Sequence, residues 1–357
     1  MPPFISIVIP IYNVARFIPN GLQCIFNQLY NDYEIILIND GSTDNSGQIC
    51  NDYANAHNNI TIIHQDNSGA GEARNKGILT AKGEYIWFFD IDDYAMPHLL
   101  TTCVDILKAN KPELLCFSFT EYDNTLKAES PYTYDNKHTM SNSEVKESFM
   151  HQLLNKTFNN GFVWNKIYQR EFLIRNNILF ESQRIQQDEI FNLKVYPKLQ
   201  TMITIPNILY RYYIYSSGNT RSYYIQNRHL IYFDVKNAFI DLFRHWDIND
   251  TKAYMYVYDR LFKGLITSLT FNLFHTNNSL TRNEKKEIMR NILNHTETLD
   301  CINKNSVLHP KNMNLLQQNY FYGIKNKSIA HLYITFQIEA LLNRIKLSIR
   351  RILKLST

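Results

Sequence analysis

The first 120 residues alternate short apolar runs with segments of helical periodicity, and this alternation constrains the fold more than any other feature. Apolar side chains at every third and fourth position predict helices, whereas short runs that are apolar throughout predict strands buried on both faces. The predicted strands are Phe4–Ile9, Glu34–Ile38, Ile60–Ile63, Tyr85–Phe89 and Leu114–Phe119, and the predicted helices are Val14–Leu29, Thr43–His57 and Ala70–Ala81. This order is typical of an α/β domain whose doubly wound, mostly parallel sheet is flanked by helices.

The patterning changes further along the chain. A polar, Tyr-rich stretch at 121–142 indicates a loop or hairpin insertion, and 143–198 returns to helical patterning. Residues 201–215 predict two strands joined at Pro206-Asn207. From about 226 onward strand signals fade, so we expect a boundary near 220–226 and a mainly helical C-terminal region over 226–357.

Composition excludes several classes of protein. The formal net charge of +4 gives no reason to expect a nucleic acid partner. The five cysteines are scattered without a CxxC pair, so neither a zinc knuckle nor a disulfide framework is predicted. The chain has no secretory start and no stretch of about 18 apolar residues, so we expect a cytoplasmic protein.

Three carboxylates, Asp90, Asp92 and Asp93, come directly after the apolar run Tyr85–Phe89. Carboxylates at the end of a buried strand repel one another and are costly to desolvate, unless a divalent cation sits among their oxygens. The alternative is a solvated turn that caps the next helix, which Pro97 is expected to open. Because parallel strands present their carboxyl ends at one edge of a sheet, Tyr12 and Asp40 are predicted to lie at the same edge.

These residues carry a resemblance to a known family. The motifs Ile7-Val8-Ile9-Pro10-Ile11-Tyr12-Asn13, Asn39-Asp40-Gly41-Ser42-Thr43-Asp44, Ala73-Arg74-Asn75-Lys76-Gly77 and Asp90-Ile91-Asp92-Asp93 occur in this order. Over about residues 4–215 the chain resembles the inverting family 2 nucleotide-sugar glycosyltransferases, which have the GT-A fold. The later motifs Trp164-Asn165-Lys166-Ile167-Tyr168 and Gln187-Asp188-Glu189-Ile190-Phe191 resemble the acceptor half of bacterial members, which build capsular polysaccharide, lipopolysaccharide or exopolysaccharide.

The resemblance implies a role for each part of the chain. Residues 1–120 would form the donor-binding half of a GT-A domain, 121–225 its acceptor-binding and catalytic-base half, and 226–357 a helical addition. Asp92 and Asp90 would hold Mn²⁺ or Mg²⁺ against the donor diphosphate. Asp40 would accept from the nucleotide base, as suits the N3–H of uracil, although Asn39 replaces the first Asp of the family's usual Asp-Asp pair.

Other substrate contacts are implied in the same way, each with a plainer alternative. Tyr12 would stack on the base or belong to the core, and Arg74 would bind the diphosphate or pair with a surface carboxylate. Trp164 would line the sugar site or the core. The remaining predicted substrate-binding residues are Pro10, Asp90, Ile91, Lys166, which would bind phosphate or acceptor, and Arg221, which would meet the diphosphate or lie in a plain linker.

Asp188 is the predicted catalytic base. In an inverting displacement the base takes the proton of the acceptor hydroxyl on the face opposite the leaving group. The family's Glu-Asp pair reads Gln187-Asp188 here, and Glu189 follows. A shifted register would make Glu189 the base, and a structural helix start is the third possibility.

The last segment, 338–357, predicts a basic amphipathic helix. Its apolar residues share one face, and five Lys and Arg residues follow Glu339 with no further acid. One interpretation is that this helix lies on the surface of an anionic leaflet, which would place the protein on the cytosolic face of a membrane. The alternative is that it docks on the protein itself, with its charged face solvated.

Together these features predict a metal-dependent inverting glycosyltransferase of polysaccharide biosynthesis. It would move a sugar from a nucleotide donor, which we expect to be a UDP-sugar, to a glycan or lipid-linked acceptor. A nucleotidyltransferase would need a glycine-rich, Lys- or Arg-bearing N-terminal loop, which this sequence lacks. The alternative from another class is a non-catalytic nucleotide- or glycan-binding subunit of a polysaccharide assembly complex.

Overall fold

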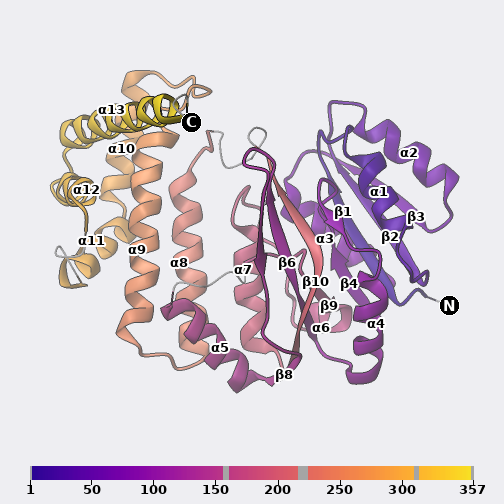
Figure 1. The fold of residues 1–357 in the computed structure, drawn as a ribbon. Coiled ribbons are helices and arrows are strands. Elements are labelled where there is room, and N and C mark those ends of the chain that lie inside the picture. Colours follow the sequence, from indigo (N-terminus) through magenta and orange to yellow (C-terminus); the bar gives the residue numbers. More distant parts are fainter. Residues whose placement is uncertain (1, 156–160, 216–223, 309–312, 355–357) are drawn as a thin grey trace. The chain divides into compact units, whose positions relative to one another are not determined.

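The computed structural model describes residues 2–155, 161–215, 224–308 and 313–354, with side chains placed to residue 304 and from 313 to 345. The chain divides into two compact units, residues 1–221 with 241–248 and residues 222–240 with 249–357 (Figure 1). The division of the first unit into donor and acceptor halves at residue 120 stays a prediction.

The first unit is built on one mixed sheet. Its strands are β1 (Ile5–Ile11), β2 (Tyr33–Asp40), β3 (Ile60–Gln65), β4 (Tyr85–Phe88), β5 (Tyr94–Ala95), β6 (Leu114–Asp123), β7 (Ala128–Tyr132), β8 (His138–Ser141), β9 (Lys166–Gln169) and β10 (Thr201–Ile214). Its helices are α1 (Ile18–Phe26), α2 (Ser46–Ala56), α3 (Ala70–Thr80), α4 (Leu99–Asn110), α5 (Asn142–Leu154), α6 (Arg170–Arg175) and α7 (Gln187–Val195), followed by the 3₁₀ turn η1 (Tyr196–Lys198). These elements confirm the predicted α/β class.

The strand order is β3-β2-β1-β4-β9-β6-β10-β5, with β7 paired to β6 and β8 to β10. β1 to β4 pair in parallel, as predicted, and β6 and β10 are also parallel to each other. β9 runs antiparallel between β4 and β6, and it was hidden by the helical patterning of 143–198. The prediction of two strands joined at Pro206-Asn207 is wrong: β10 is continuous, and its pairing with β6 shifts between Ile205 and Ile208 because proline has no N–H to donate.

Burial on both faces explains why β1 is apolar throughout. Ile7 and Ile9 point into a core shared with α1 and α4, whereas Val8 points to the other face. There Gly77 of α3 lies so close that a Cβ on it would stand 2.2 Å from a Val8 methyl. The sheet is therefore covered on both faces, which leaves its strand ends as the place for polar side chains.

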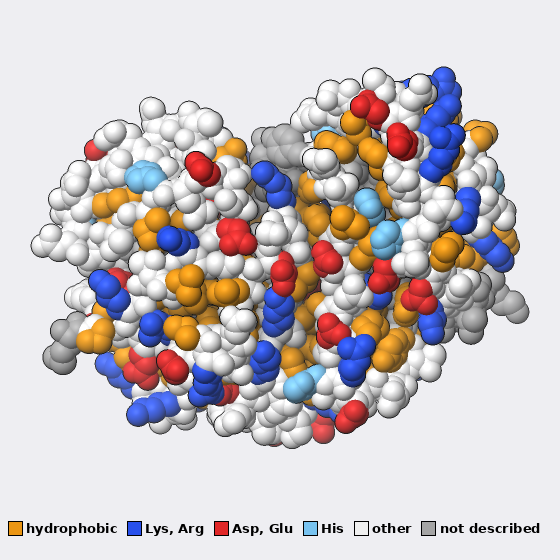
Figure 2. Space-filling model, turned by 180° about the vertical axis from the view of Figure 1, so that it is seen from behind, with side chains coloured by type: hydrophobic (Ala, Val, Ile, Leu, Met, Phe, Trp, Pro, Cys, Tyr) orange, Lys and Arg blue, Asp and Glu red, His pale blue; other side chains and the backbone are white. Residues whose placement is uncertain are grey.

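The second unit is helical, as predicted. It contains most of α8 (Arg228–His245), α9 (Thr251–Thr267) with the π-helical turn η3 (Ser268–Asn272), α10 (Arg282–Asn294), α11 (Thr296–Leu308), α12 (Leu315–Lys325) and α13 (Ile329–Lys354). Side chains of α9, α10, α12 and α13 form a core of its own, including Phe262, Leu293, Phe321 and Leu332. Among the helices of the described residues, none combines the length and the apolar character needed to cross a membrane. On the face drawn in Figure 2, acidic and basic side chains are interspersed.

Candidate active site

The carboxyl ends of neighbouring parallel strands place several predicted site residues at one edge of the sheet. β1 lies between β2 and β4, with Ile11 opposite Asn39. Tyr12 directly follows β1, Asp40 ends β2, and Asp90 follows β4 by two residues. Tyr12 is 46% exposed, so its ring is available to a base in a way that a core tyrosine is not.

Arg74 joins two of the predicted carboxylates. It lies in α3 with only 4% of its surface exposed. One terminal nitrogen, Nη2, contacts Asp90 Oδ1 at 2.9 Å, and the other, Nη1, contacts Asp188 Oδ1 at 2.9 Å. Burial by itself would lower the pKa of Arg74, but the charges of Asp188 and Asp90 outweigh it and the pKa is raised. The predicted metal carboxylate and the predicted base are thus held by a single guanidinium.

The three carboxylates after β4 have different surroundings. Burial, and then the charge of Asp90, raises the pKa of Asp92 to about 6. Asp93 is buried and accepts from the Tyr210 hydroxyl at 2.7 Å and from the Tyr213 N–H at 2.9 Å. For Asp93 the alternative of a solvated turn that caps the next helix is wrong, because Asp93 is buried and α4 begins at Leu99 with His98 as its N-cap. Asp93 instead fastens the strand end to β10.

Asp40 is 3% exposed and braces the loop before α3. Its carboxylate accepts from Gln65 Nε2, Ser68 N and Gly69 N, each at 2.8 Å. Two of these donors are backbone N–H groups at the start of α3 that a phosphate would otherwise use. Two carboxylate oxygens have about four lone-pair sites, so three bonds leave capacity for one further donor such as a base N–H.

Two predicted substrate contacts lie inside the protein. Trp164 is 2% exposed and stacks on Tyr210, with ring centroids 4.6 Å apart. Lys166 is fully buried, and its Nζ donates to Phe162 O at 2.6 Å and Asn165 Oδ1 at 2.9 Å. Desolvation lowers the pKa of Lys166 to about 8. The surroundings of both side chains are those of packed interior residues, and their predicted substrate contacts stay predictions.

The remaining predicted substrate-binding residues are Ile91, Pro10 and Arg221. Ile91 is 3% exposed, and its carbonyl lies against Gly21 of α1, where a Cβ would stand 2.3 Å away. Pro10 is partly buried within β1. Arg221 lies outside the described residues, so its predicted contact with the diphosphate stays a prediction.

Several buried or charged groups in and around the candidate site residues were not predicted from the sequence. In the described part of the chain, Arg74 Nε and the side-chain amide atoms Gln183 Nε2, Gln186 Oε1 and Gln187 Oε1 are buried without a hydrogen-bond partner. Arg16 was missed as well: it lies over the Phe17 ring at 4.4 Å, and its charge opposes the rise in the pKa of Asp92. Loop residues of this kind leave no periodic signal in a sequence.

The carboxylates at this edge suit a cation that is also held by its substrate. Among the described residues no three His, Cys, Asp or Glu side chains form a metal-binding group. Mg²⁺ in phosphate-transferring sites is commonly bound through one or two carboxylates plus phosphate and water. Burial, together with the charge of Asp90, raises the pKa of Asp92, and a cation beside its carboxylate would offset both effects. Asp92 and Asp90 therefore fit the chemistry of such an ion.

Comparison with known proteins identifies relatives of this chain. A family model described as glycosyl transferase family 2 matches residues 6–175. The "Uncharacterized glycosyltransferase EpsJ" of Bacillus subtilis is 33% identical over 213 residues, which cover 59% of this chain and 61% of that protein. The "Putative glycosyltransferase EpsH" of the same organism is 30% identical over 62% of this chain and 64% of its own length. The chain thus spans less than two thirds of these curated relatives.

A solved structure has a similar fold. The crystal structure of S. aureus TarS 1–349 in complex with UDP-GlcNAc superposes with a TM-score of 0.62 at 18% sequence identity, over 96% of this chain and 92% of that chain. The likeness extends through the helical region as well as the sheet. It supports the GT-A-like architecture with a helical C-terminal region.

Proposed function

We propose that this protein, whose residues 6–175 match the model of glycosyl transferase family 2, transfers a sugar from a nucleotide donor to a glycan or lipid-linked acceptor, with inversion, in the synthesis of a surface polysaccharide. The observation that carries the proposal is the contact of Arg74 with both Asp90 and Asp188. It unites a carboxylate from the donor half of the sequence with the candidate base from the acceptor half.

In the proposed reaction the acceptor oxygen attacks the anomeric carbon of the sugar. The bond from that carbon to the donor diphosphate breaks, and the acceptor proton passes to a carboxylate oxygen of Asp188. Arg74 fixes Asp188 from one side and adds positive charge beside the departing diphosphate. A divalent ion held by Asp92 and Asp90, when bound, would neutralise charge on the leaving group.

The proposed donor is a UDP-sugar. Tyr12 is exposed enough to stack on a base, and Asp40 keeps the capacity to accept one more N–H. TarS, whose fold is shared, was crystallised with UDP-GlcNAc, which makes UDP-sugars the first donors to try. The test is release of nucleoside diphosphate from a donor panel with Mn²⁺, with and without lipid or glycan acceptors. Absence of turnover and of donor binding across the panel would reject the proposal.

Replacement of Asp92 by Asn gives a test of the metal assignment. The folded-state pKa of about 6 lies above the ordinary value, so the charged form of Asp92 is disfavoured in the fold. Above pH 6 this cost is fully present, and it disappears as the pH falls toward 4. Asp92→Asn should therefore raise the melting temperature at pH 8 in EDTA by about 3 °C, and abolish the further rise that Mn²⁺ gives the unmodified protein. Equal Mn²⁺ shifts in both proteins would remove Asp92 from the proposed ligands.

The surface of α13 supports a proposed contact with an anionic membrane. Large apolar side chains recur along one face at helical spacing and are each 42–59% exposed: Ile334, Ile338, Leu341, Leu342 and Ile345. The sequence that follows adds Lys346, Arg350, Arg351 and Lys354, whose side chains are outside the described part. An apolar stripe beside basic residues is the pattern of a helix lying in the headgroup region.

Leu341→Asp should weaken binding to vesicles containing phosphatidylglycerol, measured by sedimentation, by about 30-fold, since a leucine buried in lipid contributes about 2 kcal/mol. Leu315→Asp is the matched control, because Leu315 of α12 is also exposed, at 75%, and lies off this stripe. If the unmodified protein does not sediment with the vesicles, or if both variants bind them as tightly as the unmodified protein, α13 is not a membrane contact.

A further inference from the structure

The first unit contains a groove of about 980 Å³ between the sheet, helix α5 and the connection from β7 to β8. Phe119 of β6 and Thr204 of β10 line it from the sheet, residues 131–138 from the connection, and Ser148 and His151 from α5. Its volume lies at the upper end of the range of roughly 300–1,000 Å³ that is typical of ligand sites. None of these residues takes part in the chemistry proposed above.

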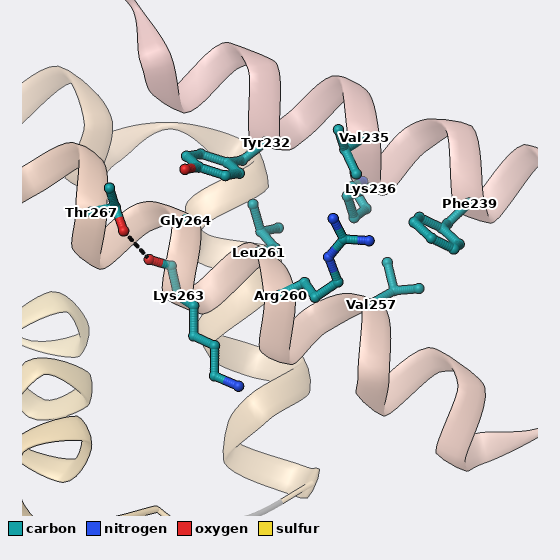
Figure 3. Close-up of a pocket in the computed structure, with 10 residues that line it drawn as sticks. All are labelled: Tyr232, Val235, Lys236, Phe239, Val257, Arg260, Leu261, Lys263, Gly264 and Thr267. Atoms are coloured by element: carbon teal, nitrogen blue, oxygen red, sulfur yellow. Dashed lines mark hydrogen bonds between the residues drawn. The ribbon is translucent and has the colours of Figure 1, made fainter. Parts of the chain in front are cut away.

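The second unit also contains a pocket, between α8 and α9, but its volume is only about 210 Å³ (Figure 3). Two of the cations that line it are already paired: Lys236 Nζ lies 2.6 Å from Glu297, and Lys263 Nζ lies 2.6 Å from Asp259. An anionic ligand would have to displace these carboxylates. The larger groove of the first unit is therefore the better candidate for a binding site.

Tyr132 gives this groove a fixed aromatic surface. Its ring stacks on that of Phe119, with the ring centroids 4.9 Å apart and an angle of 13° between the ring planes. Its hydroxyl donates to Glu121 Oε2 at 3.1 Å, and the residue is still 38% exposed. One face of the ring is thus held by the protein, while the exposed part of the side chain borders the groove. The C–H face of a sugar ring is apolar and packs well on such a surface.

The walls of the groove are tied to the rest of the unit. The Tyr134 N–H donates to Ser118 Oγ of β6 at 2.9 Å, which holds the connection against the sheet. Asn142, the first residue of α5, donates from Nδ2 to Leu199 O at 2.8 Å and to Tyr196 O at 3.1 Å. A ligand that enters a groove with fixed walls loses little of its binding energy to ordering the protein.

Polar side chains of both charges surround the aromatic surface. Among the described residues, the lining has a single carboxylate, that of Asp135, and a single ammonium, that of Lys137. Both residues are exposed, and neither forms an ion pair within the described part of the chain. The two opposite charges offset each other, which favours an uncharged ligand. Sugar hydroxyls both donate and accept hydrogen bonds, so they suit such a mixture of groups.

One wall of the groove leads toward the candidate base. Asn165 belongs to the lining, and its Oδ1 accepts from Lys166 Nζ at 2.9 Å. Burial lowers the pKa of Lys166, and the charges of Cys116 and Asp188 act against that shift. Asn165 and Lys166 therefore connect the groove with the neighbourhood of Asp188, to which the reacting hydroxyl of an acceptor must come.

We propose that this groove binds the non-reacting part of an uncharged glycan acceptor. One sugar ring lies on Tyr132, and hydroxyls of the glycan bond with Asp135 and Lys137. This inference rests on the proposed transfer reaction and deepens it, because it gives the acceptor a chemical class and a place to bind away from the reacting hydroxyl.

Calorimetric titration of the full chain with maltotriose, cellotriose and triacetylchitotriose tests the proposal without donor or metal. At least one of these uncharged trisaccharides should bind, and more tightly than the acidic trigalacturonate. Tyr132→Ala should weaken that binding about 10-fold, as expected for loss of one aromatic contact. Tyr132→Phe keeps the ring and should bind within about twofold of the unmodified protein. Tyr322→Ala is the matched control, since Tyr322 of α12 is also exposed, at 47%, and packs on Phe321 in the other unit.

Four results would overturn this assignment. They are the absence of binding by all three uncharged trisaccharides, tighter binding of trigalacturonate, binding that survives Tyr132→Ala, and binding that is equally weakened by Tyr322→Ala. Melting curves of the variants establish that each one is folded. The donor panel is a separate measurement: donor turnover without trisaccharide binding rejects only the groove, whereas trisaccharide binding without donor turnover rejects the transferase proposal and leaves a glycan-binding groove.

Discussion

Replacement of Asp188 by Asn is expected to slow sugar transfer by about 10²- to 10⁴-fold, the range for loss of a general base. An amide has nearly the shape of a carboxylate but does not take up the acceptor proton. Its oxygen can still accept from Arg74 Nη1, which now lies 2.9 Å from Asp188, so the surrounding structure should persist. Donor binding, measured by thermal shift with Mn²⁺, should stay within about twofold of the unmodified protein.

Glu189→Gln is the matched control for this prediction. Glu189 is the neighbouring carboxylate in the first turn of α7, and the shifted register would make it the base. We expect Glu189→Gln to retain most of the transfer rate. A large loss in Glu189→Gln together with full activity in Asp188→Asn would transfer the role to Glu189.

The first 120 residues of the fold could be predicted because their signals are local. Each apolar run became a strand, and the residue that follows each run stands at a strand end. The helix predicted to start at Thr43 instead starts at Ser46, with Asn45 as its N-cap. The side chain of Asn13 accepts from Thr43 N at 2.8 Å, and Ser42 Oγ accepts from Asn13 N at 3.1 Å. These residues tie two strand ends together, a tertiary use that propensity does not reveal.

The contact between Arg74 and Asp188 could not be predicted from the sequence either, because it too is a tertiary contact. The two residues are 114 positions apart, and their contact depends on how α3 and α7 pack. Trp164 and Lys166 show what the sequence leaves undecided. Aromatic and basic residues inside a motif suggest ligand contacts, yet both side chains are buried, Lys166 at the start of β9 and Trp164 just before that strand. Residue type indicates possible chemistry, whereas burial decides which side chains can reach a ligand.

Arg74→Met is expected to lower the free energy of unfolding by about 3 kcal/mol and to reduce transfer strongly. Removing one partner of a buried ion pair costs about 3–5 kcal/mol, because the other charge remains. We expect the low end of this energy range, since the side chains of Asp90 and Asp188 are each 26% exposed. Arg74→Lys should lose less stability, because a single ammonium still provides charge but not the fork that reaches both carboxylates. Urea unfolding at pH 8 measures these differences.

The double variant Arg74→Met with Asp188→Asn separates loss of the ion pair from loss of packing. With Arg74 gone, Asp188 is a charge without its guanidinium, so neutralising it should restore part of the lost stability. In the unmodified protein the same change removes a paired charge and should cost stability. The two effects therefore have opposite signs, and their difference measures the coupling, expected at about 1–3 kcal/mol for residues in contact. If the changes in the free energy of unfolding of the two single variants simply add in the double variant, Arg74 and Asp188 do not pair in solution. The proposal that Arg74 holds Asp90 and Asp188 together would then lose its support.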